Sequence, residues 1–299
     1  MSNRSFKFSI DRGGTFTDVF CECENGKQRI MKLLSEDPSN YNDAPTEGIR
    51  RILEEETGIP HPKNKPVDTS RIQYIRMGTT VATNALLERK GERTALITTK
   101  GFKDLQYIGN QSRPKIFELN IRRPDVLFEM VEELDERVVL VKEGEYECPN
   151  ADDVVIGISQ ESLYIEKQID ENEVKAKLEQ IKARGITCIA VALMHSYTFP
   201  AHEKCVERIA RELGFTQVSL SSTIMPMVRL VPRGCTTCVD AYLTPVLKRY
   251  LSSFCAGFDS ELAKVAVCFM QSDGGLTSMN TFLGNRSILS GPAGRFECS

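Results

Sequence analysis

The sequence lacks several features, and each absence argues against a class of protein. Its 299 residues contain no tryptophan and only three histidines, His61, His195 and His202. No uninterrupted apolar stretch approaches the roughly 20 residues that cross a membrane, and Met1–Arg4 leads into no apolar signal segment. We therefore expect a cytosolic protein without a membrane partner.

Neither sign of charge is in excess. Lysine and arginine number 38, aspartate and glutamate number 41, and the formal net charge is -3. Such a chain creates no basic field, so we expect no nucleic-acid partner. Its 41% hydrophobic and 26% charged residues are ordinary for a globular protein, and its length allows one large or two modest domains.

The ten cysteines are scattered and follow no signal peptide, which favours reduced, packed thiols over disulfides. Cys235 and Cys238 have C-x-x-C spacing, but no second pair accompanies them and histidines are few. A zinc site is therefore not expected. The residues on either side of the pair offer nothing that lowers a thiol pKa, so a redox role is not favoured either.

The most informative segment is a glycine turn after a short apolar strand. It reads Asp11-Arg12-Gly13-Gly14-Thr15-Phe16-Thr17-Asp18. Adjacent glycines let the backbone take positive φ and approach an anion, and two threonines add hydroxyl donors. Asp11 and Asp18 are carboxylates able to hold Mg²⁺ through water. A structural hairpin is the alternative, but it requires none of the hydroxyls. We predict that phosphate is bound by Asp11, Gly13, Gly14, Thr15, Thr17 and Asp18.

Hydrophobic periodicity predicts an α/β protein. Predicted strands cover 7–10, 29–34, 72–77, 94–98, 187–193, 218–220 and 265–270. Predicted helices cover 44–57, 81–90, 173–184, 202–213 and 236–254. Residues 100–168, which include Arg122 and Arg123, have a weak pattern and are interpreted as an insertion or β-rich excursion. Residues 289–294 are interpreted as a second small-residue loop.

Two further groups of polar residues lie at predicted element ends. Thr79 and Thr80 start a helix and Asn84 follows one turn later, so they are candidates for ligand binding, with simple helix capping as the alternative. His195 leads a polar group, His195-Ser196-Tyr197, past the carboxyl end of the strand 187–193, where open α/β sheets place ligands. A histidine satisfied by local hydrogen bonds is the favoured interpretation there.

Four segments together resemble the hydantoinase A and oxoprolinase family: Ile10–Val19, Lys32–Pro38, Met77–Gly91 and Ser290–Gly294. Arg12 and the run Ser35–Pro38 favour the oxoprolinase branch. The resemblance implies a ribonuclease-H-like or actin-like ATPase half. Its N-terminal domain is expected at 6–220, and the start of a second hydantoinase A/oxoprolinase domain, truncated, at 221–299.

The resemblance also implies an activity, which is hydrolysis of 5-oxo-L-proline to L-glutamate with cleavage of ATP to ADP and phosphate, within glutathione turnover. Magnesium and a monovalent cation such as K⁺ are implied cofactors, and a homo-oligomer is implied at full length. On this basis Asp11 and Asp18 position Mg–ATP. Thr79, Thr80 and Asn84 are assigned to the substrate, and the catalytic residues are unassigned.

One departure from the family affects the expected activity. Family members continue past the Ser290–Gly294 segment into a second Asp-x-Gly-Gly-Thr motif, whereas this sequence reads Arg295-Phe296-Glu297-Cys298-Ser299 and ends. We therefore expect half of a nucleotide site. The alternatives are a non-catalytic truncated or splice product that binds nucleotide weakly or pairs with full-length subunits, and an ATP-dependent hydantoinase.

Overall fold

The structure, a computed structural model, describes residues 5–297 except 24–25, 111–116, 118, 121–123, 142–147 and 149–153. The features predicted at Met1–Arg4, Arg122–Arg123 and Cys298–Ser299 lie outside the described residues. The chain forms two compact units, one of residues 1–91 with 246–299 and one of residues 92–245. This spatial division does not test the sequence regions 6–220 and 221–299, which stay a prediction.

Unit 1 is built on a six-stranded sheet in the order β13-β12-β4-β1-β2-β3. Its strands are β1 (Phe6–Arg12), β2 (Phe16–Glu22), β3 (Gln28–Leu34), β4 (Ile72–Thr79), β12 (Ala266–Met270) and β13 (Leu276–Ser278). The first three strands are antiparallel, whereas β4 runs parallel to both β1 and β12. All strands predicted for this part of the sequence are confirmed, with small shifts at their ends.

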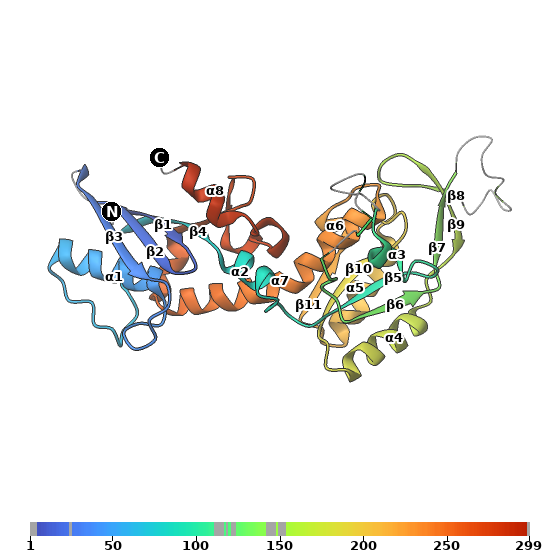
Figure 1. Ribbon diagram of the computed structural model, residues 1–299, viewed down its shortest axis with the longest axis horizontal. Helices are drawn as coiled ribbons and strands as arrows, with labels where there is room; N and C mark the ends of the chain where they lie inside the picture. The colour runs from blue at the N-terminus through green and yellow to red at the C-terminus, as the bar shows by residue number, and fades with distance from the viewer. Residues whose placement is uncertain are drawn as a thin grey trace. The chain divides into compact units, whose positions relative to one another are not determined.

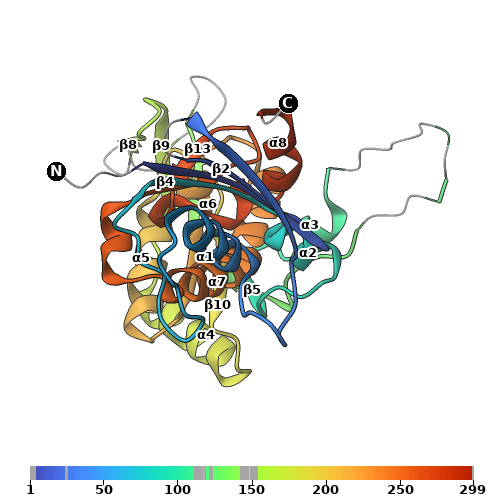
Figure 2. The ribbon, with the colours of Figure 1, turned by 90° about the vertical axis from the view of Figure 1, so that its left-hand side faces the viewer.

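Helix α1 (Ala44–Thr57) covers one face of the sheet, as Figure 2 shows. Its start is set by the Asp43 carboxylate, which accepts the Thr46 N–H, and its end by Gly58 at a φ of 65°. Alternate residues of β1 and β2 are buried, as expected where one sheet face is covered. The other face carries the remaining side chains of these strands, including the two acids of the glycine turn.

Five further helices of the described structure lie wholly in unit 1, and of these α8 contacts β4 and β12 (Figure 1) and η4 contacts β12. They are α2 (Val81–Leu87), η3 (Ser260–Lys264), η4 (Met279–Thr281), η5 (Gly284–Arg286) and α8 (Ser290–Glu297). The prediction of a loop at 289–294 is wrong, because residues from Ser290 onward form the first turns of α8. Pro292 is compatible with this because the first turn of a helix needs no N–H donor there.

Unit 2 holds a parallel sheet in the order β11-β10-β5-β6. Its strands are β5 (Thr94–Thr99), β6 (Met130–Leu134), β10 (Cys188–Ala192) and β11 (Gln217–Leu220). Its helices are α3 (Leu105–Ile108), α4 (Glu171–Ala183), α5 (Ala201–Glu212) and α6 (Ser221–Ile224). Every residue of β5 and β10 is buried, as in parallel strands that are covered on both faces.

Residues 100–168 are only in part an excursion. Strand β6 joins the parallel sheet, while β7 (Arg137–Leu140), β8 (Val154–Ile156) and β9 (Ser162–Lys167) form a separate antiparallel sheet, so the β-rich character is confirmed. Helix α7 (Leu230–Ala256) begins six residues before the predicted start at 236 and contains Pro245.

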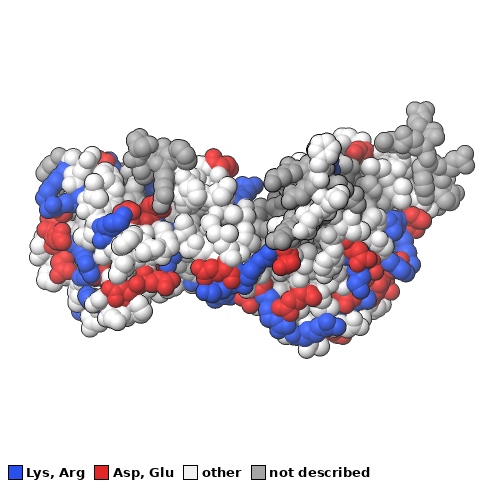
Figure 3. Space-filling view, in the orientation of Figure 1, with Lys and Arg blue, Asp and Glu red and all other residues white. Residues whose placement is uncertain are grey.

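The surface and the helices agree with the composition. Acidic and basic side chains alternate over the face drawn in Figure 3 and form no single field of one sign. Within the described ranges, none of the helices combines the length and the apolar character needed to cross a membrane.

Candidate functional site

The glycine turn joins β1 to β2, and its shape is set by close backbone contacts. The Gly13 N–H donates to the Phe16 carbonyl at 3.0 Å. The expectation of positive φ is wrong, because neither Gly13 nor Gly14 is among the glycines with positive φ. Glycine is needed here for space. A Cβ at Gly13 would lie 2.8 Å from the Phe16 oxygen, and one at Gly14 would lie 3.2 Å from Asn84 Nδ2.

Ser35, directly after β3, stabilises the turn through hydrogen bonds to its backbone carbonyls. Its hydroxyl donates to the Gly13 carbonyl at 2.7 Å, and its N–H donates to the Thr15 carbonyl at 2.9 Å. Because the single Ser35 hydroxyl hydrogen is used there, Thr17 donates to Ser35 Oγ, at 3.0 Å. Thr17 is fully buried, whereas Gly14 and Thr15 are exposed. The Thr17 hydroxyl therefore supports the turn and does not face solvent.

The two acids of the turn are direct partners across the sheet. Asp11 on β1 pairs in register with Asp18 on β2, so both side chains lie on the same face, opposite α1. Lys32 on β3 pairs with Asp18 at 2.7 Å, and both side chains of this ion pair are about half exposed, 55% and 50%. Like charges placed opposite each other repel, and a cation relieves the repulsion. This donor set fits Mg²⁺, which binds through one or two carboxylates and retains water.

The start of α2 lies against the turn. The Thr80 N–H and hydroxyl both donate to the Arg12 carbonyl, at 3.0 and 3.2 Å, and Asn84 Nδ2 donates to Thr80 Oγ1 at 3.4 Å. Thr79 is fully buried, and its hydroxyl oxygen accepts the Val81 N–H at 3.2 Å. The structure thus brings Thr80 and Asn84 to Gly14, while Thr79 acts as a local cap.

The start of α8 completes this arrangement. The Thr79 N–H donates to Ser290 Oγ at 3.3 Å, and Ser290 is fully buried. A Cβ at Gly291 would lie only 2.5 Å from Thr80 Cγ2, so glycine is required for α8 to approach α2. Three segments that are far apart in the sequence therefore meet within unit 1. They are the glycine turn, the start of α2 and the start of α8.

Sequence reasoning did not identify Ser35 or Tyr250 as residues of this site. Ser35 belongs to the run Ser35–Pro38 that resembles the family, and a small polar residue at the end of a strand next to a glycine turn is a signal that could have identified it. The Arg12 guanidinium lies 5.0 Å from the centre of the Tyr250 ring, a cation–π contact that fixes the residue before Gly13. No sequence signal links Tyr250, on α7, to the turn.

The polar group after β10 lies in unit 2 and serves local structure. His195 has a φ of 56°, and burial together with the nearby Arg233 guanidinium lowers its pKa. The Ser196 hydroxyl donates to the Leu193 carbonyl at 3.0 Å. Tyr197 donates to Glu161 at 3.1 Å, and burial and this bond raise its pKa to about 12. These hydrogen bonds belong to Ser196 and Tyr197 and none of them involves the His195 ring, so the interpretation of His195 as satisfied by local hydrogen bonds stays a prediction.

The C-x-x-C pair is not a metal site in the described structure. Cys235 is exposed, Cys238 is buried, and both are free thiols on α7. Burial raises the pKa of each thiol. Among the described residues, no group of three or more histidine, cysteine, aspartate or glutamate side chains has the geometry to hold a metal ion.

The fold and the three converging segments define an α/β protein with a mixed sheet and a glycine-turn site. The chain belongs to the hydantoinase/oxoprolinase family. The model of the hydantoinase/oxoprolinase N-terminal region matches residues 7–214, and the hydantoinase/oxoprolinase model matches residues 233–297.

Named relatives agree with this family. Over 289 residues the chain is 57% identical to 5-oxoprolinase 1 of Arabidopsis thaliana, covering 96% of this chain and 23% of the relative. It is 52% identical over 298 residues to 5-oxoprolinase of Dictyostelium discoideum, covering 97% of this chain and 23% of the relative. The chain therefore spans about a quarter of the length of these relatives.

Solved structures agree with the expected α/β fold of a hydantoinase/oxoprolinase N-terminal domain. The ATP-dependent caprolactamase from Pseudomonas jessenii superimposes with a TM-score of 0.72 at 23% identity, over 96% of this chain and 39% of that one. A nucleotide-free acetone carboxylase gives a TM-score of 0.70 at 21% identity, over 97% of this chain and 39% of that one. At these identities the likeness shows the fold alone.

Proposed function

We propose that this chain is the N-terminal portion of an ATP-dependent 5-oxoprolinase, which hydrolyses 5-oxo-L-proline to L-glutamate while ATP is cleaved to ADP and phosphate. The observation that supports this most is the meeting of the glycine turn, the start of α2 and the start of α8 in unit 1. The names of the relatives support the choice of substrate.

The turn is proposed to hold the phosphates of ATP. Gly14 and Thr15 are exposed and present backbone to solvent, and Gly13 shapes the turn below them. Phosphate oxygens are well bound by closely spaced N–H groups and by hydroxyls such as that of Thr15. Thr17 contributes indirectly, because its hydroxyl is committed to Ser35. We assign Thr17 as a residue that positions the turn.

Asp11 and Asp18 are proposed to hold Mg²⁺, in part through water. The ion would neutralise phosphate charge, on which phosphoryl transfer depends. The ion pair of Asp18 with Lys32 is exposed, so breaking it when Asp18 binds Mg²⁺ costs at most about 1 kcal/mol. In that exchange the Lys32 ammonium is free to approach a phosphate oxygen. A monovalent cation is also proposed, without assigned ligands.

On the substrate side, the structure favours Thr80 and Asn84 over Thr79, which is buried and caps α2. The proposed chemistry follows from the stability of a lactam. Transfer of the γ-phosphoryl group to the lactam oxygen releases ADP and activates the ring carbon. One water molecule then adds to that carbon and the C–N bond breaks, which opens the ring and leaves an acyl phosphate with a free amine. A second water molecule hydrolyses the acyl phosphate to L-glutamate and phosphate. A cytosolic homo-oligomer at full length completes the proposal.

The test is release of L-glutamate from 5-oxo-L-proline by this chain with Mg–ATP, with hydantoin as a second substrate. Turnover with 5-oxoproline supports the proposal. Binding of Mg–ATP without turnover supports the alternative of a non-catalytic product that pairs with full-length subunits. Turnover with hydantoin alone favours a hydantoinase, and absence of both binding and turnover overturns the assignment of the turn.

A further inference from the structure

A second candidate site lies in unit 1, on the side of α1. A half-open pocket of about 580 Å³ is lined by the loop 38–43, the first turns of α1, the segment 63–67 and the end of α7. This volume is typical of sites for small molecules. The glycine turn contributes no residue to its lining, so the pocket is separate from the proposed phosphate site.

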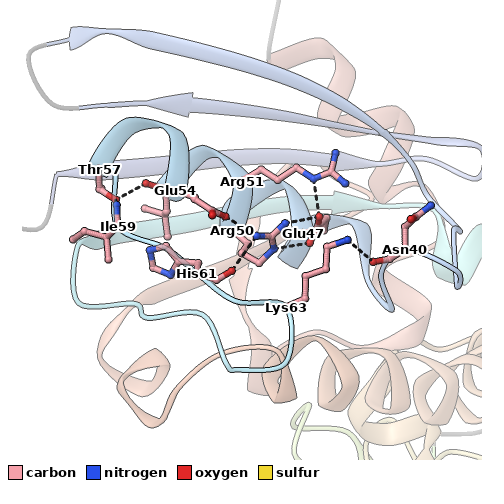
Figure 4. A network of polar contacts seen from close by, with 10 residues as sticks. Asn40, Glu47, Arg50, Arg51, Glu54, Thr57, Ile59, His61 and Lys63 are labelled. Carbon is pink, nitrogen blue, oxygen red and sulfur yellow. Dashed lines mark hydrogen bonds and ion pairs between the residues drawn. The ribbon is translucent and has the colours of Figure 1, made fainter.

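Glu47 and Arg50 line the pocket and belong to a cluster of ion pairs on α1 (Figure 4). Glu47 is 4% exposed and accepts hydrogen bonds from Arg50, at 2.7 Å to each oxygen, and from Arg51 at 2.6 Å. Burial opposes ionisation of Glu47, but the two arginines outweigh it and lower its pKa. Arg50 also donates to Glu54 and to the His61 carbonyl. The charges of this cluster are therefore already satisfied.

The segment 63–67 contributes two lysines to the lining, and their ammonium groups make fewer or longer contacts than the arginines of α1. Lys63 Nζ donates to the Asn40 carbonyl at 3.3 Å, a long contact at an exposed position. Lys65 is exposed, and no side-chain partner of its ammonium is found among the described residues. Its N–H donates to the Pro62 carbonyl at 3.0 Å, which holds the segment in a turn. Two ammonium groups thus stand on a restrained segment beside the pocket.

Asp43, an acid of the lining, uses only one of its two carboxylate oxygens in hydrogen bonds of the described structure. Asp43 Oδ2 accepts from the Thr46 N–H at 3.0 Å and from the Thr46 hydroxyl at 2.6 Å as the cap of α1. Within the described structure no hydrogen bond engages Asp43 Oδ1. A ligand in the pocket therefore meets one carboxylate oxygen and two ammonium groups. A phosphate or sulfate would gain from Lys63 and Lys65 but would be repelled by Asp43.

We propose that this pocket binds an acidic α-amino acid, with Lys63 and Lys65 pairing its two carboxylates and Asp43 accepting its ammonium group. The charges match, because the ligand has two anionic groups and one cationic group. The choice of L-glutamate as the particular acidic amino acid rests on the proposed function, whose ring-opening reaction would produce it. The pocket is then a product-binding site beside the sheet that carries the glycine turn.

The test is calorimetric titration of the full chain with L-glutamate in the absence of nucleotide. Glutarate, which lacks the ammonium group, and L-glutamine, which lacks the second carboxylate, serve as matched probes. The variants are Lys63→Ala/Lys65→Ala and Asp43→Asn, which keeps a capping oxygen. Lys27→Ala is the charge control, because Lys27 pairs with Glu56 and does not line the pocket. Circular dichroism checks that each variant is folded.

L-Glutamate is expected to bind more tightly than either probe. The double lysine variant should weaken it at least about fivefold, as the loss of two partly exposed ion pairs requires. Asp43→Asn should weaken L-glutamate but not glutarate, and Lys27→Ala should change nothing. Equal affinity for L-glutamate, glutarate and L-glutamine, or unchanged binding of L-glutamate in the double lysine variant, overturns the proposal. Because no nucleotide is present, failure of the phosphate site would leave this result unaffected.

Discussion

Replacing Ser35 with alanine should destabilise the glycine turn, because it removes the side chain that supports the turn's backbone. The change removes the hydroxyl that donates to the Gly13 carbonyl at 2.7 Å and accepts from Thr17 at 3.0 Å. A hydrogen bond is worth about 1 kcal/mol net, and a buried polar group left without a partner costs about 1–3 kcal/mol. Thr17 is fully buried, so water does not readily replace the lost acceptor. We expect the free energy of unfolding of unit 1 to fall by about 2 kcal/mol.

The assay is urea denaturation of the chain, together with the Kd for Mg–ATP. Thr17→Val removes the other partner, and the double variant removes both, so the double variant should lose about 1 kcal/mol less than the sum of the single losses. The Kd for Mg–ATP should rise in Ser35→Ala, because the turn is less well held. A loss of stability below about 0.5 kcal/mol, or strictly additive single changes, would refute the assignment of Ser35 as the support of the turn.

Three further changes test the packing and electrostatics of each unit. Gly291→Ala places a methyl group 2.5 Å from Thr80 Cγ2 and should cost about 1–3 kcal/mol by denaturation, and Thr80→Ser, which removes that methyl, should restore most of the loss. Arg233 is fully buried and bonds the Leu193 carbonyl and Ser221, so Arg233→Met should cost about 3 kcal/mol in unit 2 by leaving buried acceptors unsatisfied. Burial and the Arg233 guanidinium lower the pKa of His195 in the folded state. The contribution of neutral His195 to stability is therefore complete above about pH 6.5 and is lost as the pH falls through the lower folded-state pKa. Denaturation measured against pH should show this slope, and His195→Asn should flatten it.

The elements of the fold were predictable where local signals were strong. Asp43 and Gly58 flank the helix predicted over 44–57, which is α1, and the strand predicted over 7–10 lies within β1. Helix α8 was not predictable in this way, because Ser290–Gly294 is rich in small residues with low helix propensity. Its helical form is supported by tertiary contact with β4 and the start of α2, which a local reading of the sequence does not include.

The candidate site was predictable as segments but not as an assembly. The glycine turn and the start of α2 were both identified from residue type, and the structure brings them together through Arg12 and Thr80. Strand alternation shows which face of the sheet carries the Thr17 side chain only once the register of β2 against β1 is known. A shift of one residue in that register would move the side chain to the other face. The support from Ser35 depends on pairing between β2 and β3, and the Arg12 contact with Tyr250 depends on α7.

Whether the glycine turn binds the phosphates of Mg–ATP is tested most directly by measuring the Kd for Mg–ATP. The proteins compared are the wild-type chain, Asp11→Asn, Gly14→Val, and Lys27→Ala as the control. We expect the wild-type chain to bind Mg–ATP and both turn variants to weaken binding at least about tenfold, which corresponds to about 1.4 kcal/mol, whereas Lys27→Ala should leave the affinity unchanged. Removal of Mg²⁺ should weaken wild-type binding and have little further effect on Asp11→Asn. Equal affinity in the wild-type chain and both turn variants would contradict the account.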